Sequence, residues 1–361
     1  MDLFTPTTLG VLNLRNRLIM APMTRLRADA AGVPTDLQAT YYAQRAGFGL
    51  VVTEGTYPSP ESRAYPHQPG IVTAQQRDGW RHVADAVHAN GGRIVLQLMH
   101  AGRVSHPDVT GTDRIVAPSA VPLTGDGHTA HGKQAYPTPH ALSPAELTVV
   151  RDEFAAAAQR AIDAGLDGVE LHAGNGYLLH QFLAPSANHR TDEYGGSPQA
   201  RARFVVEVAE AVAQQIGGSR VGIRLTPAVN IQGALETDPA DLRETYDALA
   251  DGLAPLGLAY LSIVHPEPAS ALVQRLRTRV GAPLVVNTGF STTSTRERAA
   301  ATVAADVAEA AVVGRPAIAN PDLVERWRND LPETEPDPAT FYGGDAAGYT
   351  DYPPCRAVVP S

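Results

Sequence analysis

The chain has 361 residues, with 29 basic and 38 acidic side chains that give a net charge of −9 at neutral pH. This balance argues against a surface that binds nucleic acid or an anionic membrane. A single cysteine, Cys355, excludes an internal disulfide framework, and no apolar stretch approaches the ~20 residues of a membrane span. The N-terminus lacks a basic region followed by an apolar one, so we expect no secretion signal and a cytoplasmic protein.

Eight short apolar runs, most of them bounded by glycine or proline, follow one another along the chain. They are too short for buried helices and are typical of strands that are covered on both faces. The runs are Arg17–Met23, Gly49–Gly55, Arg93–Leu98, Gly168–His172, Val221–Thr226, Ala259–Val264, Pro283–Thr288 and Ala308–Gly314.

Helical patterns with start signals lie between these runs. Ser143-Pro144-Ala145-Glu146 is a capping box with proline at the first helical position, and it predicts a helix to about Ala164. Ser197-Pro198 opens another helix that runs to about Ile216, and two more are predicted over Pro239–Leu253 and Ser270–Val280. Eight alternations of strand and helix predict an α/β fold, a single (β/α)₈ TIM barrel that spans residues 1–361 as one domain.

Residues 99–142, between the third strand and its helix, form a long insertion rich in proline, glycine and histidine. It contains two short strand-like pieces near Arg114–Val116 and Lys133–Ala135. A loop of this length in a compact domain predicts a lid or a binding element.

The segment after the fourth strand carries the most informative polar cluster, Glu-Leu-His-Ala-Gly-Asn-Gly-Tyr at residues 170–177. His172 and Asn175 can both donate a hydrogen bond to one oxygen, and Tyr177 can deliver a proton nearby. These groups are suited to polarising a carbonyl and protonating the carbon beside it. The alternative is a polar turn whose side chains only satisfy their own backbone.

Polar residues at other strand ends indicate what the barrel binds, because active sites of this fold lie at the carboxyl ends of the strands. Gly289, and Gly314 with Arg315, follow the seventh and eighth strands, where such barrels often hold a phosphate; a surface salt bridge is the alternative for Arg315. Arg224 lies inside an apolar strand and needs a partner, either an anionic cofactor or an internal carboxylate. The amide of Gln97 can pair with a heterocycle. Together these features favour flavin mononucleotide with a carbonyl substrate stacked on it, and the chain lacks a Rossmann glycine motif.

Several ordered motifs resemble the old yellow enzyme family of FMN-dependent ene-reductases, from Leu3-Phe4 to Asp351-Tyr352-Pro353. The motifs are Asn16-Arg17, Ala21-Pro22-Met23-Thr24-Arg25, Gln97 to Arg103, Glu170 to Leu179, Gln181-Phe182-Leu183, Asn188 to Ser197 and Phe341-Tyr342-Gly343-Gly344. Thr24 and the C-terminal Tyr-Gly-Gly segment resemble the classical bacterial branch related to pentaerythritol tetranitrate reductase.

The resemblance implies a non-covalent FMN site at the barrel mouth. It implies that Thr24 binds the flavin C4 carbonyl, Gln97 holds the pyrimidine edge, and Arg224 lies near N1 and the C2 carbonyl. Arg315 and the backbone around two glycines would hold the phosphate. The implied cofactor-binding residues are Pro22, Met23, Thr24, Gly55, Gln97, Arg224, Gly289, Gly314 and Arg315.

The resemblance also implies ping-pong reduction of activated C=C bonds in α,β-unsaturated carbonyls, maleimides and nitroalkenes, with NADPH or NADH as hydride donor. Hydride would pass from flavin N5 to the β-carbon, while His172 and Asn175 bind the substrate oxygen and Tyr177 donates the proton. Tyr342 would shape the pocket. Met99 stands where close relatives often carry a bulky aromatic residue, so substrate size and orientation do not transfer to this chain.

Three other functions are compatible with parts of the sequence. A nitrate-ester or nitroaromatic reductase would use the same residues, and a flavin-binding protein without catalysis would leave the polar cluster unused. A metal-dependent barrel hydrolase would draw on histidines of the insertion, whose spacings fit no standard zinc motif. Those histidines are His100, His106, His128, His131 and His140. The physiological alkene, the preferred nicotinamide and the choice between monomer and homodimer are not encoded in recognisable motifs.

Overall fold

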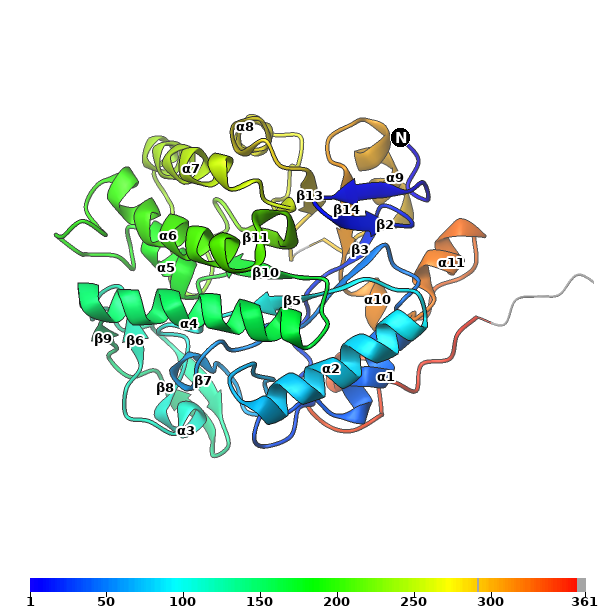
Figure 1. The fold of residues 1–361 in the computed structure, drawn as a ribbon, viewed down its shortest axis with the longest axis horizontal. Coiled ribbons are helices and arrows are strands. Elements are labelled where there is room, and N and C mark those ends of the chain that lie inside the picture. The colour runs from blue at the N-terminus through cyan, green and yellow to red at the C-terminus, as the bar shows by residue number, and fades with distance from the viewer. Residues whose placement is uncertain (291, 356–361) are drawn as a thin grey trace, which may run out of the picture.

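A closed parallel barrel forms the centre of the computed structural model, which describes residues 1–290 and 292–355 (Figure 1). Each of the eight predicted apolar runs coincides with one barrel strand, although β10 extends one residue beyond its run, so the expected TIM barrel is confirmed. Within the described residues the strands, in barrel order, are β3 (Leu18–Met20), β4 (Leu50–Val52), β5 (Ile94–Leu98), β10 (Gly168–Ala173), β11 (Val221–Leu225), β12 (Tyr260–Val264), β13 (Leu284–Asn287) and β14 (Ala310–Val313).

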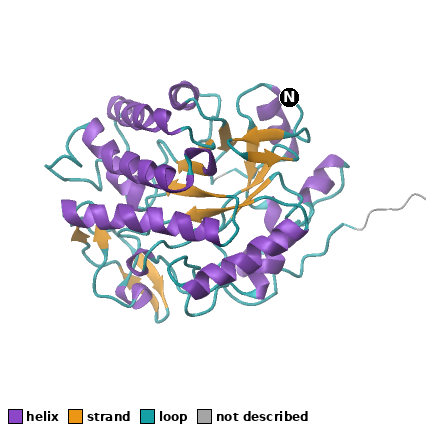
Figure 2. Ribbon diagram, in the orientation of Figure 1, coloured by secondary structure: helices purple, strands orange, loops and turns teal. Residues whose placement is uncertain are grey.

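Helices surround the barrel (Figure 2). The larger outer helices are α1 (Asp36–Gln44), α2 (Ala74–Ala89), α4 (Pro144–Asp163), α6 (Pro198–Ile216), α7 (Pro239–Leu253), α8 (Ala271–Val280) and α9 (Arg296–Ala304). Short helices are α5 (Leu178–Leu183), α10 (Pro316–Ala319), α11 (Leu323–Arg328) and the 3₁₀ turns η1 (Pro60–Ser62), η2 (Gly218–Arg220), η3 (Ala254–Leu256) and η4 (Pro338–Thr340). The predicted capping box starts α4, because the Ser143 hydroxyl accepts the Glu146 N–H and the Glu146 carboxylate accepts the Ser143 N–H at 2.7 Å.

Side chains alternate between the two faces of each barrel strand. Outward-facing residues pack against the helices in one large apolar cluster, which includes Leu171 of β10 and Ile223 of β11. A second cluster fills the lower barrel with inward-facing residues such as Leu50 and Val285. It also contains Leu9 and Leu12 from the antiparallel hairpin β1 (Thr7–Leu9) and β2 (Leu12–Leu14), so this hairpin closes the amino-terminal end of the barrel.

The insertion between β5 and α4 lies at lower left in Figure 1, on the side away from the β1–β2 hairpin. It contains α3 (Pro107–Thr110), β6 (Val116–Ala117), β7 (Asp126–Thr129), β8 (Gly132–Ala135) and β9 (His140–Ala141). β7 and β8 form an antiparallel hairpin, whereas β6 pairs with β9 in parallel. The strand-like pieces predicted near Arg114–Val116 and Lys133–Ala135 overlap β6 and β8, and the role of the insertion as a lid stays a prediction.

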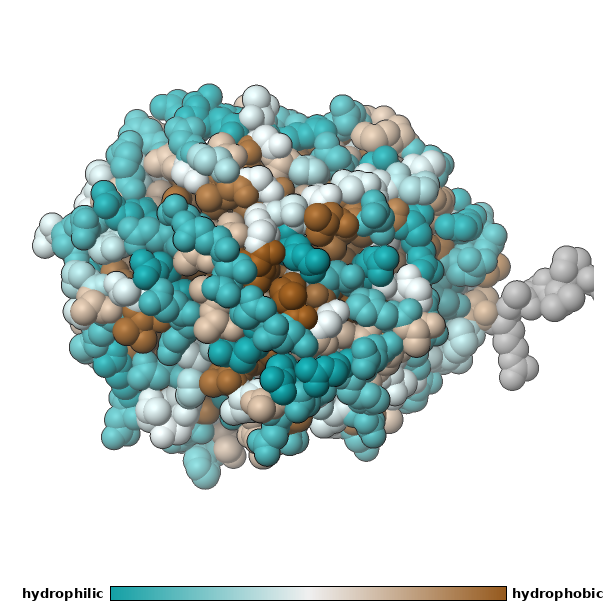
Figure 3. All heavy atoms as spheres, in the orientation of Figure 1, coloured by the Kyte–Doolittle hydropathy of each residue, from teal (hydrophilic) through white to brown (hydrophobic). Residues whose placement is uncertain are grey.

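Hydrophilic side chains predominate on the face drawn in Figure 3, where apolar residues form scattered patches. No helix in the described part of the chain combines the length and the apolar character that crossing a membrane requires.

Candidate active site

The predicted cluster of His172, Asn175 and Tyr177 lies where β10 turns into α5. Asn175 and Gly176 both have left-handed backbones, with φ of 57° and 78°, conformations that asparagine and glycine adopt at low cost. The turn brings the rings of His172 and Tyr177 together, with centroids 5.2 Å apart and planes inclined at 61°. The structure therefore brings the three predicted side chains to one place.

Neighbouring side chains fix this turn through its backbone. The Thr226 hydroxyl accepts the Asn175 N–H at 2.9 Å, and His180 Nδ1 accepts the Gly176 N–H at 2.9 Å. Gln232 donates to the Asn175 carbonyl oxygen at 2.9 Å. Because other groups satisfy these backbone atoms, the side chains of the turn are left for another partner.

Two polar atoms of the cluster are buried without a hydrogen-bond partner among the described residues, His172 Nδ1 and Asn175 Oδ1. Leaving such an atom unpaired costs about 1–3 kcal/mol, so a bound ligand that pairs with it recovers this free energy. A half-turn of the Asn175 carboxamide presents its NH₂ group instead of its oxygen. Each of the two side chains can then offer a donor to a ligand.

Burial sets the protonation states of the cluster. It lowers the pKa of His172 well below its ordinary 6.5, helped by the positive charge of Arg224 and by His180, so the imidazole is neutral. Burial raises the pKa of Tyr177 above 10.0, so the phenol keeps its proton. The site therefore contains a neutral donor next to a weak acid.

Tyr65 is a site residue that the sequence did not reveal. Its hydroxyl lies 3.0 Å from the Tyr177 hydroxyl, although the two residues are 112 positions apart. Met99 is 2 % exposed and packs in the same small apolar cluster as Tyr177, which fits its predicted place in the substrate pocket. A Cβ at Gly55 would lie 2.6 Å from Met99 Sδ, so the glycine permits this approach.

The inward positions nearer the carboxyl ends of β5, β10, β11 and β12 are polar, in contrast to the apolar lower barrel. Gln97 donates from Nε2 to Glu170 Oε1 at 2.8 Å, and Arg224 donates to the Ser262 hydroxyl at 3.3 Å. Glu170 also raises the pKa of Arg224 through its charge, although burial lowers that pKa more. Of the two partners considered for Arg224, the structure contains the internal carboxylate.

A cavity of about 130 Å³ opens at the carboxyl ends of β13, β14 and β3. It is lined by Ala21, Pro22, Met23, Arg224, Asn287, Gly289, Phe290, Thr292, Thr293, Ser294, Gly314 and Arg315. Six of the predicted cofactor residues therefore share this cavity. The Gly289 N–H already donates to Asn287 Oδ1 at 3.0 Å, and Arg315 donates to the Phe290 carbonyl oxygen. Thr24 is half-buried on the segment that follows Met23.

Tyr342 lies on the C-terminal segment, with 67 % of its surface exposed, yet its phenol is close enough to raise the pKa of Tyr177. Two buried arginines hold this segment. Arg25 donates to the carbonyl oxygens of Phe341 at 2.8 Å and Gly348 at 2.9 Å. Arg27 donates to those of Thr340, Asp345 and Ala347 at 3.0–3.3 Å. Residues 340–348 are thus attached to the segment that follows β3 at the barrel mouth.

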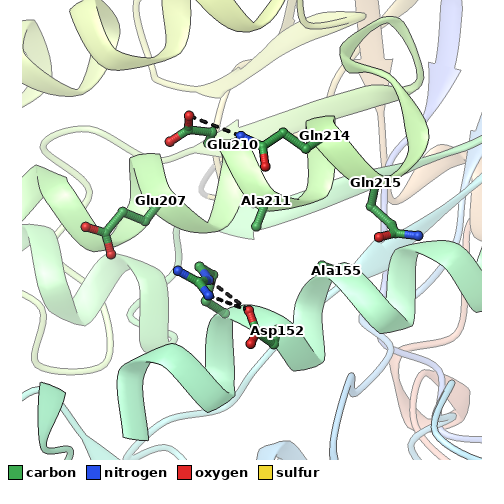
Figure 4. Close-up of a pocket in the computed structure, with 8 residues that line it drawn as sticks. Asp152, Ala155, Glu207, Glu210, Ala211, Gln214 and Gln215 are labelled. Carbon is green, nitrogen blue, oxygen red and sulfur yellow. Dashed lines mark hydrogen bonds and ion pairs between the residues drawn. The ribbon is translucent and has the colours of Figure 1, made fainter. Parts of the chain in front are cut away.

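A separate polar groove of about 410 Å³ lies between α4 and α6, lined by Arg151, Asp152, Ala155, Glu207, Glu210, Ala211, Gln214 and Gln215 (Figure 4). It contains none of the predicted site residues. Among the described residues, no group of three or more histidine, cysteine or acidic side chains is arranged to hold a metal ion. Burial lowers the pKa of His100 to about 3, and its Nδ1 accepts the Gly102 N–H at 3.0 Å.

The sequence model of one protein family, described as the NADH:flavin oxidoreductase / NADH oxidase family, matches residues 2–334. The chain belongs to this family. Its curated relatives include a probable flavin mononucleotide-dependent alkene reductase of Leishmania infantum, which is 42 % identical over 96 % of both chains. 12-Oxophytodienoate reductase 1 of Oryza sativa subsp. japonica is 39 % identical, over 97 % of this chain and 92 % of the relative.

Solved structures share the fold of almost the whole chain. Morphinone reductase in complex with tetrahydroNAD superposes with a TM-score of 0.93 at 44 % identity, covering 100 % of this chain and 99 % of that one. An old yellow enzyme homologue from Zymomonas mobilis has a TM-score of 0.92 at 39 % identity, over 98 % and 99 %. The protein is thus a flavin oxidoreductase of the NADH:flavin oxidoreductase family and an old yellow enzyme homologue, as its motifs predicted.

Proposed function

We propose that the protein is an FMN-dependent ene-reductase that reduces the C=C bonds of α,β-unsaturated carbonyls, maleimides and nitroalkenes with NADPH or NADH. One observation carries this proposal. Neutral His172 and Asn175 each have a buried polar atom without a hydrogen-bond partner among the described residues, and a protonated Tyr177 lies beside them. The names of an alkene reductase and a 12-oxophytodienoate reductase among the relatives support the same class of substrate. We further propose a cytoplasmic protein of one domain, as a monomer or homodimer of the classical bacterial branch.

The residues present fit FMN. The 130 Å³ cavity contains Arg315 and Gly289, whose φ of 101° and open surroundings leave room for a close approach. Arg315, Gly289 and Gly314 would hold the phosphate, and the ring would contact Pro22, Met23, Thr24, Gly55, Gln97 and Arg224. FMN, when bound, supplies the hydride that it has taken from the nicotinamide.

His172 and Asn175 bind the oxygen of the substrate and so orient the alkene. As hydride reaches the β-carbon, negative charge develops on that oxygen, and donors already in place stabilise it without rearrangement. The loss of one such donor costs about 3 kcal/mol by analogy with oxyanion holes. Neutral His172 suits this role, because its charge state need not change during the reaction.

Tyr177 gives its proton to the α-carbon. At 6 % exposure it is shielded from bulk water, and the Tyr65 hydroxyl, 3.0 Å away, can donate a hydrogen bond as the phenolate forms. A hydrogen bond of this kind stabilises the charged form of the acid. Tyr65 thus assists the proton transfer through Tyr177.

Anaerobic stopped-flow absorbance near the flavin band, at about 450 nm, tests the proposal, because it follows the two half-reactions separately. Addition of NADPH or NADH should bleach the band, and 2-cyclohexenone should then restore it. The relative bleaching rates identify the preferred nicotinamide. Reconstituted protein without a flavin band would exclude the function, and bleaching without recovery would exclude the alkene substrate.

The pKa directions at the site predict a flat pH profile for the enone half-reaction. The pKa of His172 lies well below 6.5, so its charged form appears only at lower pH, and the pKa of Tyr177 lies above 10.0, so its proton is lost only at higher pH. Stopped-flow rates of enone reduction should therefore show no inflection between pH 6.5 and pH 10.0. An inflection near neutral pH that disappears in His172→Ala would contradict these assignments.

Met99→Trp should change the relative rates for large and small enones, or the face of the alkene that is reduced, while FMN stays bound. Met99 packs against the Tyr177 cluster and the Gly55 backbone, so the larger indole must displace the neighbouring pocket wall. The measurement is a panel of substituted cyclohexenones with chiral product analysis. Met99→Leu, of similar volume, is the control, and an unchanged panel for the tryptophan variant would argue against a pocket role.

A further inference from the structure

Glu170 lies at the centre of a polar layer inside the barrel that crosses four adjacent strands. In the strand register it faces Gln97 of β5 on one side and Gly222 of β11 on the other. Gly222 in turn faces Tyr260 of β12. His172, Arg224 and Ser262 occupy the next inward layer, nearer the carboxyl ends of the strands. Glu170 therefore lies level with Gln97 and one layer below the predicted contacts His172 and Arg224.

The absence of a side chain at Gly222 shapes this layer. A Cβ there would lie only 2.2 Å from Tyr260 Cζ, so the phenol ring of Tyr260 occupies the space above β11. That placement brings Tyr260 beside Glu170, whose charge helps to raise the pKa of the phenol. The Glu170 carboxylate is thus surrounded by Gln97, Tyr260 and the more distant Arg224.

In the hydrogen bond between Gln97 and Glu170, Gln97 is the donor. An ionised carboxylate can only accept hydrogen bonds, so Gln97 must turn its NH₂ group toward Glu170, as the 2.8 Å contact from Nε2 to Oε1 records. Its oxygen and second N–H remain for another partner. A neutral amide at position 170 could donate as well as accept, and would no longer impose this orientation.

Glu170 also supplies the negative charge that offsets Arg224. The two side chains are 1 % and 4 % exposed, and isolated charges at such burial are costly. Burial is the largest influence on both groups and raises the pKa of Glu170 while it lowers that of Arg224. The charge of each group opposes this effect in the other, so the guanidinium favours the ionised carboxylate and the carboxylate favours the charged guanidinium. The negative charge of Glu170 therefore partly offsets the positive charge that Arg224 presents to a bound ligand.

We infer that Glu170 is a positioning residue of the flavin site, which orients the Gln97 carboxamide and weakens the electrostatic pull of Arg224 on the flavin ring. This inference rests on the proposed function, in which Gln97 and Arg224 contact FMN. Reduction places negative charge on the ring, and a carboxylate nearby opposes it. Ionised Glu170 therefore lowers the midpoint potential of the bound flavin.

The test measures the potential and the FMN dissociation constant rather than turnover. Holoenzyme is titrated anaerobically with dithionite beside a redox indicator dye, for the wild type, Glu170→Gln and Glu170→Asp. We expect Glu170→Gln to raise the midpoint potential, because the opposing charge is gone. Glu170→Asp keeps the charge but withdraws it from Gln97, so it should bind FMN about tenfold more weakly with a smaller change in potential.

Glu309→Gln is the matched control. Glu309 pairs with Arg277 and accepts the Leu284 N–H at 2.6 Å, at the amino-terminal end of β14 and so at the opposite end of the barrel. Its variant should leave the potential unchanged. Wild-type potential in Glu170→Gln, or unchanged FMN affinity in Glu170→Asp, would overturn the inference while leaving the proposed function intact. A wild type that binds no FMN would overturn both.

Discussion

Tyr177→Phe is expected to slow enone reduction by about 10²-fold or more, while flavin reduction by NADPH or NADH keeps its wild-type rate. A positioned general acid contributes about 10²–10⁴-fold, and the variant removes the proton while keeping the ring. The phenol is 6 % exposed and retains its proton because burial raises its pKa, so bulk water cannot easily replace it.

Stopped-flow measurement of the two half-reactions separates the effects of this substitution. Tyr194→Phe is a suitable control, because Tyr194 is 9 % exposed and its hydroxyl donates to Glu207 at 3.1 Å, in contact with α6 and outside the site. It should affect neither half-reaction. An unaffected enone rate in Tyr177→Phe would remove Tyr177 as the proton donor and would direct attention to Tyr65.

His172→Ala is expected to slow enone reduction by about 10²-fold and to weaken the binding of phenolic charge-transfer ligands. The substitution removes a donor aimed at developing negative charge, at a cost of about 3 kcal/mol. Asn175→Ala should act in the same direction. Because both groups bind one oxygen, the effects of the double variant should fall short of the sum.

Spectral titration with a substituted phenol measures this binding directly, and the flavin content of each variant shows whether the cofactor is retained. His82→Ala, at an exposed position on α2, is the control and should bind the phenol as the wild type does. Full retention of phenol binding by His172→Ala would exclude His172 as the group that binds the substrate oxygen.

The fold could be predicted because each barrel strand carries its own signal, a short apolar run that is buried on both sides. The cluster of His172, Asn175 and Tyr177 could be predicted because its members lie on one turn, where spacing along the chain determines spacing in the structure. The family followed from motifs of the same local kind, and the family match confirmed it. The individual flavin contacts stay a prediction.

Contacts between distant segments could not be predicted in this way. Tyr65 reaches Tyr177 from an irregular segment, and nothing in the residues around it indicates that contact. The position of Glu170 opposite Gln97 depends on strand register, which the apolar runs leave undetermined. The use of the Gly289 N–H by Asn287 likewise depends on side-chain geometry at the end of β13.

The way in which residues 340–348 are attached to the barrel allows their side chains to vary. Every hydrogen bond from the guanidinium groups of Arg25 and Arg27 to the described residues 340–348 ends on a main-chain oxygen. Main-chain oxygens are present whatever the side chain, so this attachment places little restriction on the sequence of the segment. We therefore expect that Tyr342, the residue predicted to shape the pocket, can be exchanged without detaching the segment, which leaves this position open to mutational drift or to engineering for new substrates.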